Sequence, residues 1–485
     1  MSHPIGNPLQ APDEAAASPA LPAALPEDLP VVPLERFLQR SDAPGAPMVF
    51  RVLLRFDGTY RRDLLTQAFD IAIRRQPLLI SRLTNRGNGL VWHPADQVPV
   101  LSWETPESPE TDLSRMGIAP LDLSFRPGVR ARVFEVDQGI TILLDINHLC
   151  CDGQGARQLL GEWFGVYDQL LTGSPVKLVT LKPQELLNRA QYRQPTPPIG
   201  LFEGLRNFWL TIRGRTVHVP ARTSTQVHDW TTDHLREVVL SVEETKRLRK
   251  QLKQARCSVN DIGLTSSFLA FAEIFPELCH RDFITILNPT DLRWPSDLKT
   301  PACNRVGVTF IRRRRRDWNS GMHLLQTIHA QLKYVKKRYV GAEFLRGLAM
   351  TESSAGLQGW LERRGYFRPT LQFTCLGDTT RAMHYRYPMV DGVINFQGAR
   401  LQRISGFMQT GTYLPISLAA CETNQRLALT VHGRNAFVSA EQTERLLNLM
   451  VQQMMQLGEL MASEPSPPQA PDEQESATDE PGELP

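Results

Sequence analysis

The residues best suited to chemistry lie between 140 and 153, where a run of aliphatic and β-branched residues ends at His148 and Asp152 follows four residues later. A general base needs an imidazole on a rigid element, with one ring nitrogen facing the substrate, and the end of a strand provides that. Asp152 can fix the following turn if it meets a cation, and Gly153 lets the backbone bend into a helix. The spacing therefore indicates a general base at a strand end.

Other kinds of site could use the same segment. His148, Cys150, Cys151 and Asp152 are possible zinc ligands, but no second ligand pair at metal spacing occurs, so we expect no metal. Cys151 could be a nucleophile beside His148. Residues so close in sequence rarely reach that geometry, and a packed thiol is the favoured alternative. A histidine taken alone is more often a core or capping residue.

The elements that must position these residues follow from hydrophobic periodicity. Residues 130–136 and 140–148 predict a hairpin, and 153–171 predicts a long helix directly after the candidate base. Before them, 48–57 predicts a strand and 61–75 a helix that stops at a proline. The candidate base thus lies between a buried strand and a helix.

A second set of elements begins after residues 195–230, which we interpret as a crossover between two halves. We expect strands over 236–241, 283–288, 305–315 and 426–432, and helices over 243–256, 259–275, 320–338 and 439–462. Both halves mix strands and helices, which predicts an α/β protein.

Charge is distributed unevenly along the 485 residues, although the formal net charge is only +3. Residues 1–30 hold four acids and 463–485 hold seven, with no Lys or Arg in either, which leaves residues 31–462 at +14. Both tails are rich in proline, and we expect them to be disordered. A basic core suits coenzyme A phosphates, a phosphopantetheinyl carrier, nucleic acid or acidic lipid. The run Arg312–Arg316 lacks interleaved aromatic residues, so we expect no nucleic acid.

The remaining composition is that of an ordinary globular protein, with 41% hydrophobic and 22% charged residues. No apolar run approaches the roughly 20 residues of a membrane span, and no secretory signal is evident. Seven scattered cysteines without framework spacing predict reduced thiols and a cytoplasmic location.

The segment NHLCCDG at 147–153 resembles the HHxxxDG motif of condensation domains, of wax ester synthase/diacylglycerol acyltransferases and of the chloramphenicol-acetyltransferase-like fold generally. By this resemblance His148 is the catalytic base, and Asp152 is structural and pairs with an arginine, here Arg293. Asn147 replaces the first histidine, which is usually a supporting residue. Gly153 completes the motif.

Further segments match the same families in the same order. Residues 256–271 resemble the helix start "TVNDVVLA", 284–293 the strand "vPVdLR", and 304–307 the following "GNrvG". Residues 371–378 resemble the "SNvpG" segment, which makes Thr374 a candidate donor to an oxyanion. The DFGWG motif of peptide-forming condensation domains is absent, which argues against direct peptide-bond formation.

The resemblance implies two half-domains of α/β sandwich type, 31–205 and 206–462, that form a V-shaped cleft crossed by a tunnel. It implies acyl transfer from a coenzyme A or carrier-protein thioester to an alcohol or amine, without an acyl-enzyme and without a bound cofactor. An acyl carrier protein is then a possible partner, and a monomer would suffice. The alternative is a non-catalytic relative that binds a carrier protein or lipid.

Overall fold

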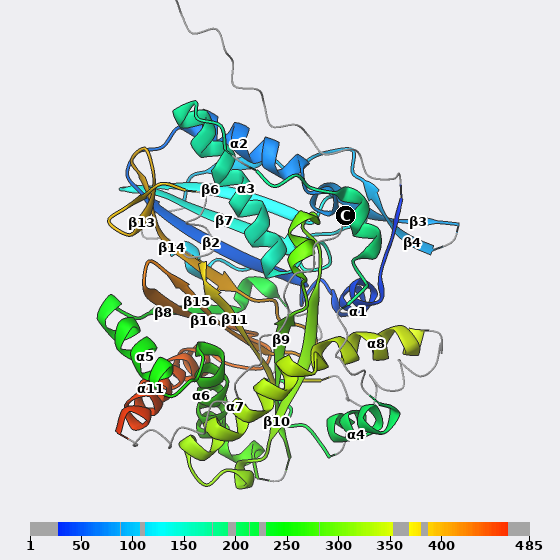
Figure 1. Cartoon of the computed structure of the whole chain (residues 1–485), viewed down its shortest axis with the longest axis vertical. Coiled ribbons are helices and arrows are strands. Elements are labelled where there is room, and N and C mark those ends of the chain that lie inside the picture. Colours follow the sequence, from blue (N-terminus) through cyan, green and yellow to red (C-terminus); the bar gives the residue numbers. More distant parts are fainter. Residues whose placement is uncertain are drawn as a thin grey trace, which may run out of the picture.

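Two large sheets, one above the other in Figure 1, form the framework of the computed structural model. The structure describes residues 28–87, 89–106, 112–176, 178–192, 200–212, 214–222, 229–280, 282–352, 368–379 and 387–463. Most of both predicted tails, 1–27 and 464–485, lies outside these residues. Leu29 and Pro30, expected in the first tail, instead form β1 and pair with β4.

The upper sheet has seven strands in the order β12-β13-β14-β2-β7-β6-β5. Their bounds are β12 Met389–Val390, β13 Val393–Phe396, β14 Ala399–Phe407, β2 Val49–Asp57, β7 Gly139–Asn147, β6 Val129–Val136 and β5 Leu101–Glu104. A small sheet beside it joins β1 (Leu29–Pro30), β4 (Gly89–Pro94) and β3 (Ser81–Arg86). The predicted hairpin of β6 and β7 is confirmed, with antiparallel pairing along its whole length.

The lower sheet has six strands in the order β10-β9-β11-β15-β16-β8. They are β10 Val306–Arg313, β9 Ile284–Asp291, β11 Leu371–Asp378, β15 Ile416–Thr423, β16 Arg426–Gly433 and β8 His234–Val239. The four strands predicted for the second half all belong to this sheet. Strands β11 and β15 were not predicted, and their parallel pairing places β11 at the centre of the sheet.

Helices cover the outer faces of both sheets (Figure 1). Above the upper sheet lie α2 (Arg62–Arg74) and α3 (Gly153–Thr172). Below the lower sheet lie α5 (Val242–Gln254), α6 (Val259–Ile274), α7 (Gly321–Lys337) and α11 (Ala440–Ser463). Three further helices are α1 (Pro33–Ser41), α4 (Leu201–Ile212) and α8 (Val340–Glu352). Helix α4 falls within the predicted crossover.

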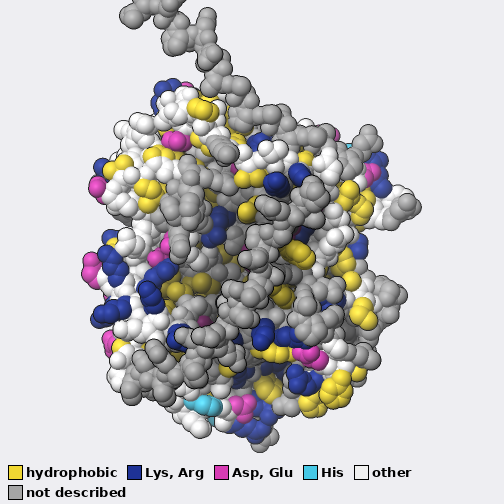
Figure 2. Space-filling view, in the orientation of Figure 1, with side chains coloured by type: hydrophobic (Ala, Val, Ile, Leu, Met, Phe, Trp, Pro, Cys, Tyr) yellow, Lys and Arg dark blue, Asp and Glu magenta, His cyan; other side chains and the backbone are white. Residues whose placement is uncertain are grey.

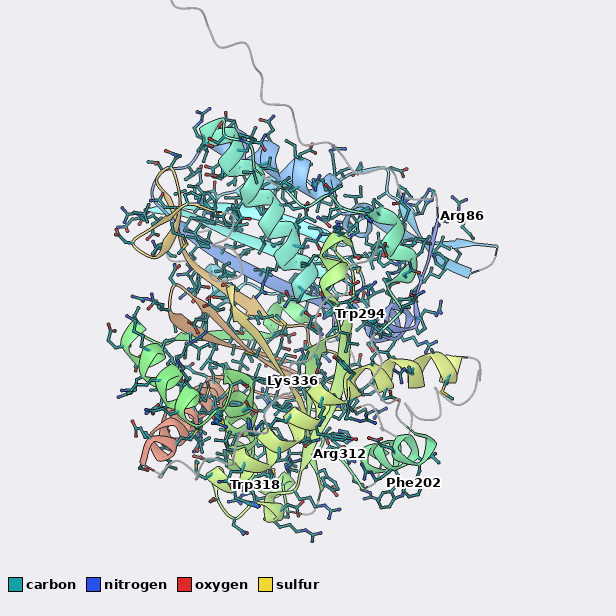
Figure 3. The ribbon with its side chains drawn as sticks, in the orientation of Figure 1. Arg86, Phe202, Trp294, Arg312, Trp318 and Lys336 are labelled. Atoms are coloured by element: carbon teal, nitrogen blue, oxygen red, sulfur yellow. The ribbon has the colours of Figure 1, made fainter. Side chains whose placement is uncertain are left out.

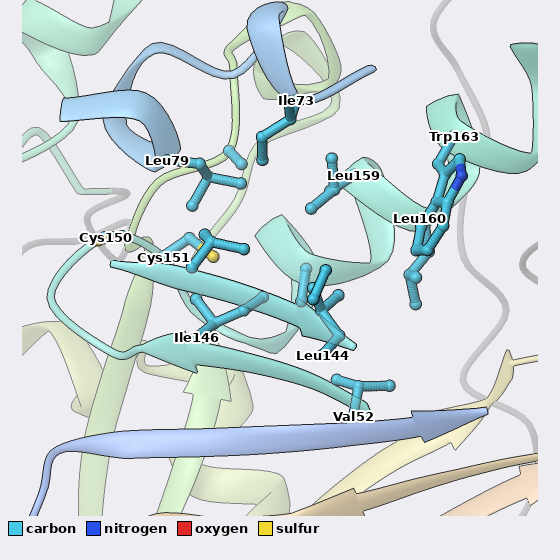
Figure 4. Close-up of a cluster of buried hydrophobic side chains, with 14 of the residues drawn as sticks. Val52, Ile73, Leu79, Leu144, Ile146, Cys150, Cys151, Leu159, Leu160 and Trp163 are labelled. Atoms are coloured by element: carbon cyan, nitrogen blue, oxygen red, sulfur yellow. The ribbon is translucent and has the colours of Figure 1, made fainter. Parts of the chain in front are cut away.

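The core of the upper half lies between α3 and the sheet (Figure 4). Leu159, Leu160 and Trp163 of α3 pack with Leu144 and Ile146 of β7, and all five are at most 3% exposed. Each such side chain contributes roughly 1.5–3 kcal/mol by leaving water. This packing fixes the end of β7 relative to the start of α3, which is where the candidate base lies.

One part of the chain departs from the expected division into 31–205 and 206–462. Strands β12, β13 and β14 come from the second range but extend the upper sheet, because β14 pairs with β2 over nearly its whole length. β2 is therefore an interior strand, with β14 on one edge and β7 on the other. Its side chains are buried on both faces over most of its length, which fits its apolar run. The two halves are joined by shared strands as well as by side-chain contacts.

Arginine and lysine side chains are prominent on the face of the molecule drawn in Figure 2, mixed with hydrophobic and acidic ones. In the described part of the chain, no helix combines the length and apolar character needed to cross a membrane.

Candidate active site

His148 follows the last residue of β7, and its backbone is held from both sides. Its N–H donates to the carbonyl oxygen of Met48 at 2.7 Å. The side-chain amide of Asn304, which precedes β10 in the lower half, donates to the carbonyl oxygens of His148 at 2.7 Å and Leu149 at 2.9 Å. The position of the imidazole is thus set jointly by the upper sheet and by a residue of the second half.

The imidazole of His148 faces a largely apolar cavity. The ring of Phe50 meets it edge to face, with the two centroids 5.3 Å apart. Within the described chain, Nδ1 is buried and makes no hydrogen bond of normal geometry. Burial lowers the pKa of His148, while its own backbone, the charge of Asp152 and the side chain of Asn304 act in the opposite direction. The ring is therefore neutral at pH 7 and able to accept a proton.

Asp152 is a buried carboxylate that connects the two halves. It caps α3 by accepting from the N–H groups of Gln154 and Gly155. Arg293 donates to both of its oxygens, at 2.8 and 3.0 Å, and the backbone N–H of Arg305 donates at 2.8 Å. Burial alone would raise the pKa of Asp152, but the Arg293 guanidinium brings it below the usual value. The pairing expected between Asp152 and Arg293 is present.

Asn147 supports the site through its amide. Its Nδ2 donates to Asp42 at 3.0 Å and to the carbonyl oxygen of Leu121 at 3.2 Å, and its Oδ1 accepts from the N–H of Leu149 at 3.0 Å. Asn147 is fully buried, so these bonds hold the turn after β7 and leave the amide no access to a ligand. Gly153 begins α3 and lines the cavity beside Leu376.

Thr374 lies on β11 and lines the same cavity as His148. Its hydroxyl oxygen accepts a hydrogen bond from the side-chain amide of Gln372 at 3.1 Å. No described residue accepts a hydrogen bond from this hydroxyl, so its hydrogen can be donated to an oxyanion. The structure thus brings His148 and Thr374, expected from opposite halves, to one cavity.

The cavity lies where the two sheets meet and has a volume of about 300 Å³. Most of its wall is hydrophobic, with contributions from α1, β2, β10, β14 and other elements of both halves. The apolar residues of this wall include Leu34, Phe37, Leu38, Met48, Phe50, Val52, Leu160, Leu287, Pro289, Val306, Val308, Leu376, Ile404, Met408 and Leu414. The expected V-shaped cleft and tunnel remain predictions.

Residues 292–305, between β9 and β10, bind the lower half to the upper half beside the site. In Figure 3, Trp294 marks this segment at the upper end of the β9–β10 pair, next to the upper half. The carbonyl oxygen of Lys299 accepts from the N–H of Lys182 at 2.7 Å, and the N–H of Ala302 donates to Gln76 at 2.7 Å. The segment also provides Arg293 and Asn304. The sequence drew attention to Asn304 only through the NRVG match.

The alternative sites at this segment receive no support from the geometry. Burial raises the pKa values of both Cys150 and Cys151, so their thiols remain protonated and weakly nucleophilic. No group of three or more metal-ligating side chains occurs among the residues that the structure describes.

Comparisons with known proteins agree with this architecture. The family model for the condensation domain matches residues 34–278. Surfactin synthase subunit 1 of Bacillus subtilis (strain 168) is 28% identical over 159 residues, which cover 32% of this chain and 4% of that protein. The chain thus spans only a small part of the length of this curated relative.

Two solved structures share the fold over most of their length. The epimerization domain from the third module of tyrocidine synthetase B superposes with a TM-score of 0.63 at 16% identity, over 90% of this chain and 96% of that one. The first condensation domain of the calcium-dependent antibiotic synthetase, in complex with a substrate analogue, gives 0.64 at 15% identity, over 88% and 93%. Condensation domains are acyl or peptidyl transferases. The match over half of the sequence shows that this chain belongs to the condensation domain family.

Proposed function

We propose that this chain transfers an acyl group from a coenzyme A or carrier-protein thioester to an alcohol or amine, with His148 as the general base. The observation that carries the proposal is the position of His148 in the wall of an apolar cavity between two sheets, where burial lowers its pKa. The hydrophobic wall of that cavity suits an acyl chain. Asp152, Gly153, Arg293 and Asn147 serve as structural support for the base.

In the proposed reaction, His148 removes the proton from the acceptor O–H or N–H as that atom attacks the thioester carbonyl carbon. The carbonyl oxygen becomes an oxyanion, to which the Thr374 hydroxyl donates a hydrogen bond. Collapse of the tetrahedral intermediate breaks the carbon–sulfur bond, and the imidazolium returns its proton to the departing thiolate. No acyl-enzyme forms, and no bound cofactor takes part.

The geometry of the supporting residues favours this use of the ring. A base must keep its orientation while it gains and loses a proton. The His148 N–H is bound to Met48, and the Asn304 amide holds the two peptide groups that follow His148. Asp152 is paired with Arg293, and burial outweighs the opposing effect of its charge, so the pKa of His148 is lowered on balance. An apolar wall also excludes water, which would otherwise compete as the acceptor.

The test is thiol release from acyl-CoA and acyl-N-acetylcysteamine donors of several chain lengths, with a panel of amines and alcohols. We expect His148→Ala to lower the rate of release by roughly 10²–10⁴-fold. His323, an exposed residue of α7, gives the control variant His323→Ala, which should match the wild-type rate. Turnover by a folded His148→Ala variant at the wild-type rate would contradict the assignment of the base.

The second candidate is a non-catalytic protein that uses the same cavity to bind a carrier protein or lipid. Asn147 favours it, because the amide occupies the place of the motif's first histidine and is fully engaged in structural hydrogen bonds. If wild-type protein binds an acyl thioester but releases no thiol with any acceptor, this candidate replaces the first.

A further inference from the structure

Arg157, on the second turn of α3, brings a positive charge to the cavity wall. Among the residues that the structure describes, its guanidinium makes two hydrogen bonds, both to neutral oxygens. Nη1 donates to the side chain of Gln154 at 3.1 Å, and Nη2 donates to the carbonyl oxygen of Leu376 at 2.8 Å. An arginine has five N–H donors, so three of them have no hydrogen-bond partner in the described part of the chain.

The carboxylates whose charges act on Arg157 are those of Asp291 and Asp378, and each lies within ion-pair distance of another arginine. Asp291 accepts from Arg293 at 3.1 Å, and Asp378 lies 3.9 Å from Arg249. Within the described chain, no carboxylate forms an ion pair with Arg157. The cavity wall includes four arginines and two aspartates, Arg40, Arg157, Arg293, Arg368, Asp152 and Asp291. Both of these aspartates bind Arg293, so positive charge remains in excess.

A guanidinium in an apolar cavity loses hydration that its neutral partners replace only in part. Burial accordingly lowers the pKa of Arg157, and the opposing effects of Cys421, Asp291 and Asp378 compensate incompletely. An anionic group in the cavity would restore the missing interaction through charge-assisted hydrogen bonds, which arginine makes especially well with carboxylates. Arg157 lies five residues beyond Asp152, about 7.5 Å along the helix axis at 1.5 Å per residue, and lines the same cavity as His148.

We propose that Arg157 selects a substrate that carries a carboxylate near its reacting group, either on the acyl chain or on the acceptor. The inference rests on the proposed acyl transfer and adds a substrate class to it. The phosphates of coenzyme A are a less suitable partner, because the long pantetheine arm separates them from the thioester.

The experiment compares matched substrates that differ only in this charge, using the full chain. Glutaryl-CoA against pentanoyl-CoA tests a carboxylate on the acyl chain, and leucine against leucinamide tests one on the acceptor. Pentanoyl-CoA against pentanoyl-N-acetylcysteamine tests the phosphates. For each pair we compare kcat/KM from thiol release and, independently of turnover, Kd from calorimetry. Wild-type protein, Arg157→Gln and Arg157→Lys are measured in parallel.

We expect the wild type to prefer the carboxylate member of one of the first two pairs by at least about tenfold in kcat/KM or affinity. Arg157→Gln should lose most of this ratio, and Arg157→Lys should keep part of it. The inference fails if the wild type shows no carboxylate preference, if only the phosphate pair discriminates, or if Arg157→Gln keeps the wild-type ratio. If Arg157→Gln does not fold, the inference is tested by the carboxylate preference of the wild type and by its partial loss in Arg157→Lys.

Thiol release with neutral and charged substrates alike would leave the acyl transfer standing and remove only this inference. Absence of thiol release from every donor would remove the proposed function, while the calorimetric ratio would still test the role of Arg157.

Discussion

Replacement of Asp152 by asparagine separates two tasks of the carboxylate. Asparagine is about as good an N-cap as aspartate, so the bonds from the N–H groups of Gln154 and Gly155 can persist. The charge opposite Arg293, however, is lost. The variant therefore tests how strongly the ion pair holds the lower half against the start of α3.

The expected loss in free energy of unfolding depends on the burial of the ion pair and on the partners that Arg293 keeps. Removing one member of a buried ion pair usually costs about 3–5 kcal/mol, because the other charge stays buried. Arg293 would keep its hydrogen bonds to the carbonyl oxygen of Cys303 at 2.9 Å and to Asp291 at 3.1 Å. We therefore expect Asp152→Asn to lower the free energy of unfolding by about 3 kcal/mol, the low end of that range. Asp152→Ala should cost about 1 kcal/mol more through loss of the cap.

Urea unfolding followed by tryptophan fluorescence measures the effect, with Asp152→Asn, Arg293→Gln and the double variant as a thermodynamic cycle. If the two side chains act as a pair, the double variant is less destabilised than the sum of the single ones. Asp63, exposed and paired with exposed Arg61, gives the control Asp63→Asn, whose midpoint should equal that of the wild type. Additive single effects, or an Asp152→Asn variant as stable as the control, would refute the reasoning.

Two further predictions follow. Because burial lowers the pKa of His148, its imidazole stays neutral to more acidic pH than a free imidazole does. We therefore expect kcat/KM for thiol release to fall only as the pH drops through a value below the ordinary 6.5. A midpoint above 6.5 would contradict the lowered pKa of His148. In α6, a methyl group at Gly263 would collide with the ring of Phe373, so Gly263→Ala should destabilise the protein by about 1–3 kcal/mol in urea. Gly347 in α8 has open space around it, so Gly347→Ala should stabilise the protein by up to about 1 kcal/mol and serves as the matched control.

The local part of the site could be predicted from sequence because it is continuous along the chain. The strand that ends at His148, the turn at Asp152 and the helix from Gly153 need only periodicity and turn chemistry, and the structure has all three. The partnership with Arg293 came from the family resemblance. A spacing of 141 residues carries no physical signal of contact.

The rest of the architecture depends on long-range pairing that single-sequence patterns do not encode. The pairing of β14 with β2 joins residues about 350 positions apart, so a division by chain position could not show that 389–407 extends the sheet of the first half. The role of Asn304 was missed for a related reason. An asparagine before a strand looks like a turn residue, and its bond to the carbonyl oxygen of His148 requires the two halves to be docked. Nor did helical periodicity single out Arg157 in α3.

The segment 292–305 makes the two halves of the molecule poor candidates for independent exchange. It belongs to the lower half in sequence, yet its Arg293 and Asn304 bind Asp152 and the backbone at His148. A chimera that took each half from a different relative would have His148 and Asp152 from one relative, and the residues that bind them, Arg293 and Asn304, from the other. We therefore expect an active chimera only when residues 292–305 and 147–157 come from the same relative, because these two segments are in contact although they are far apart in the sequence.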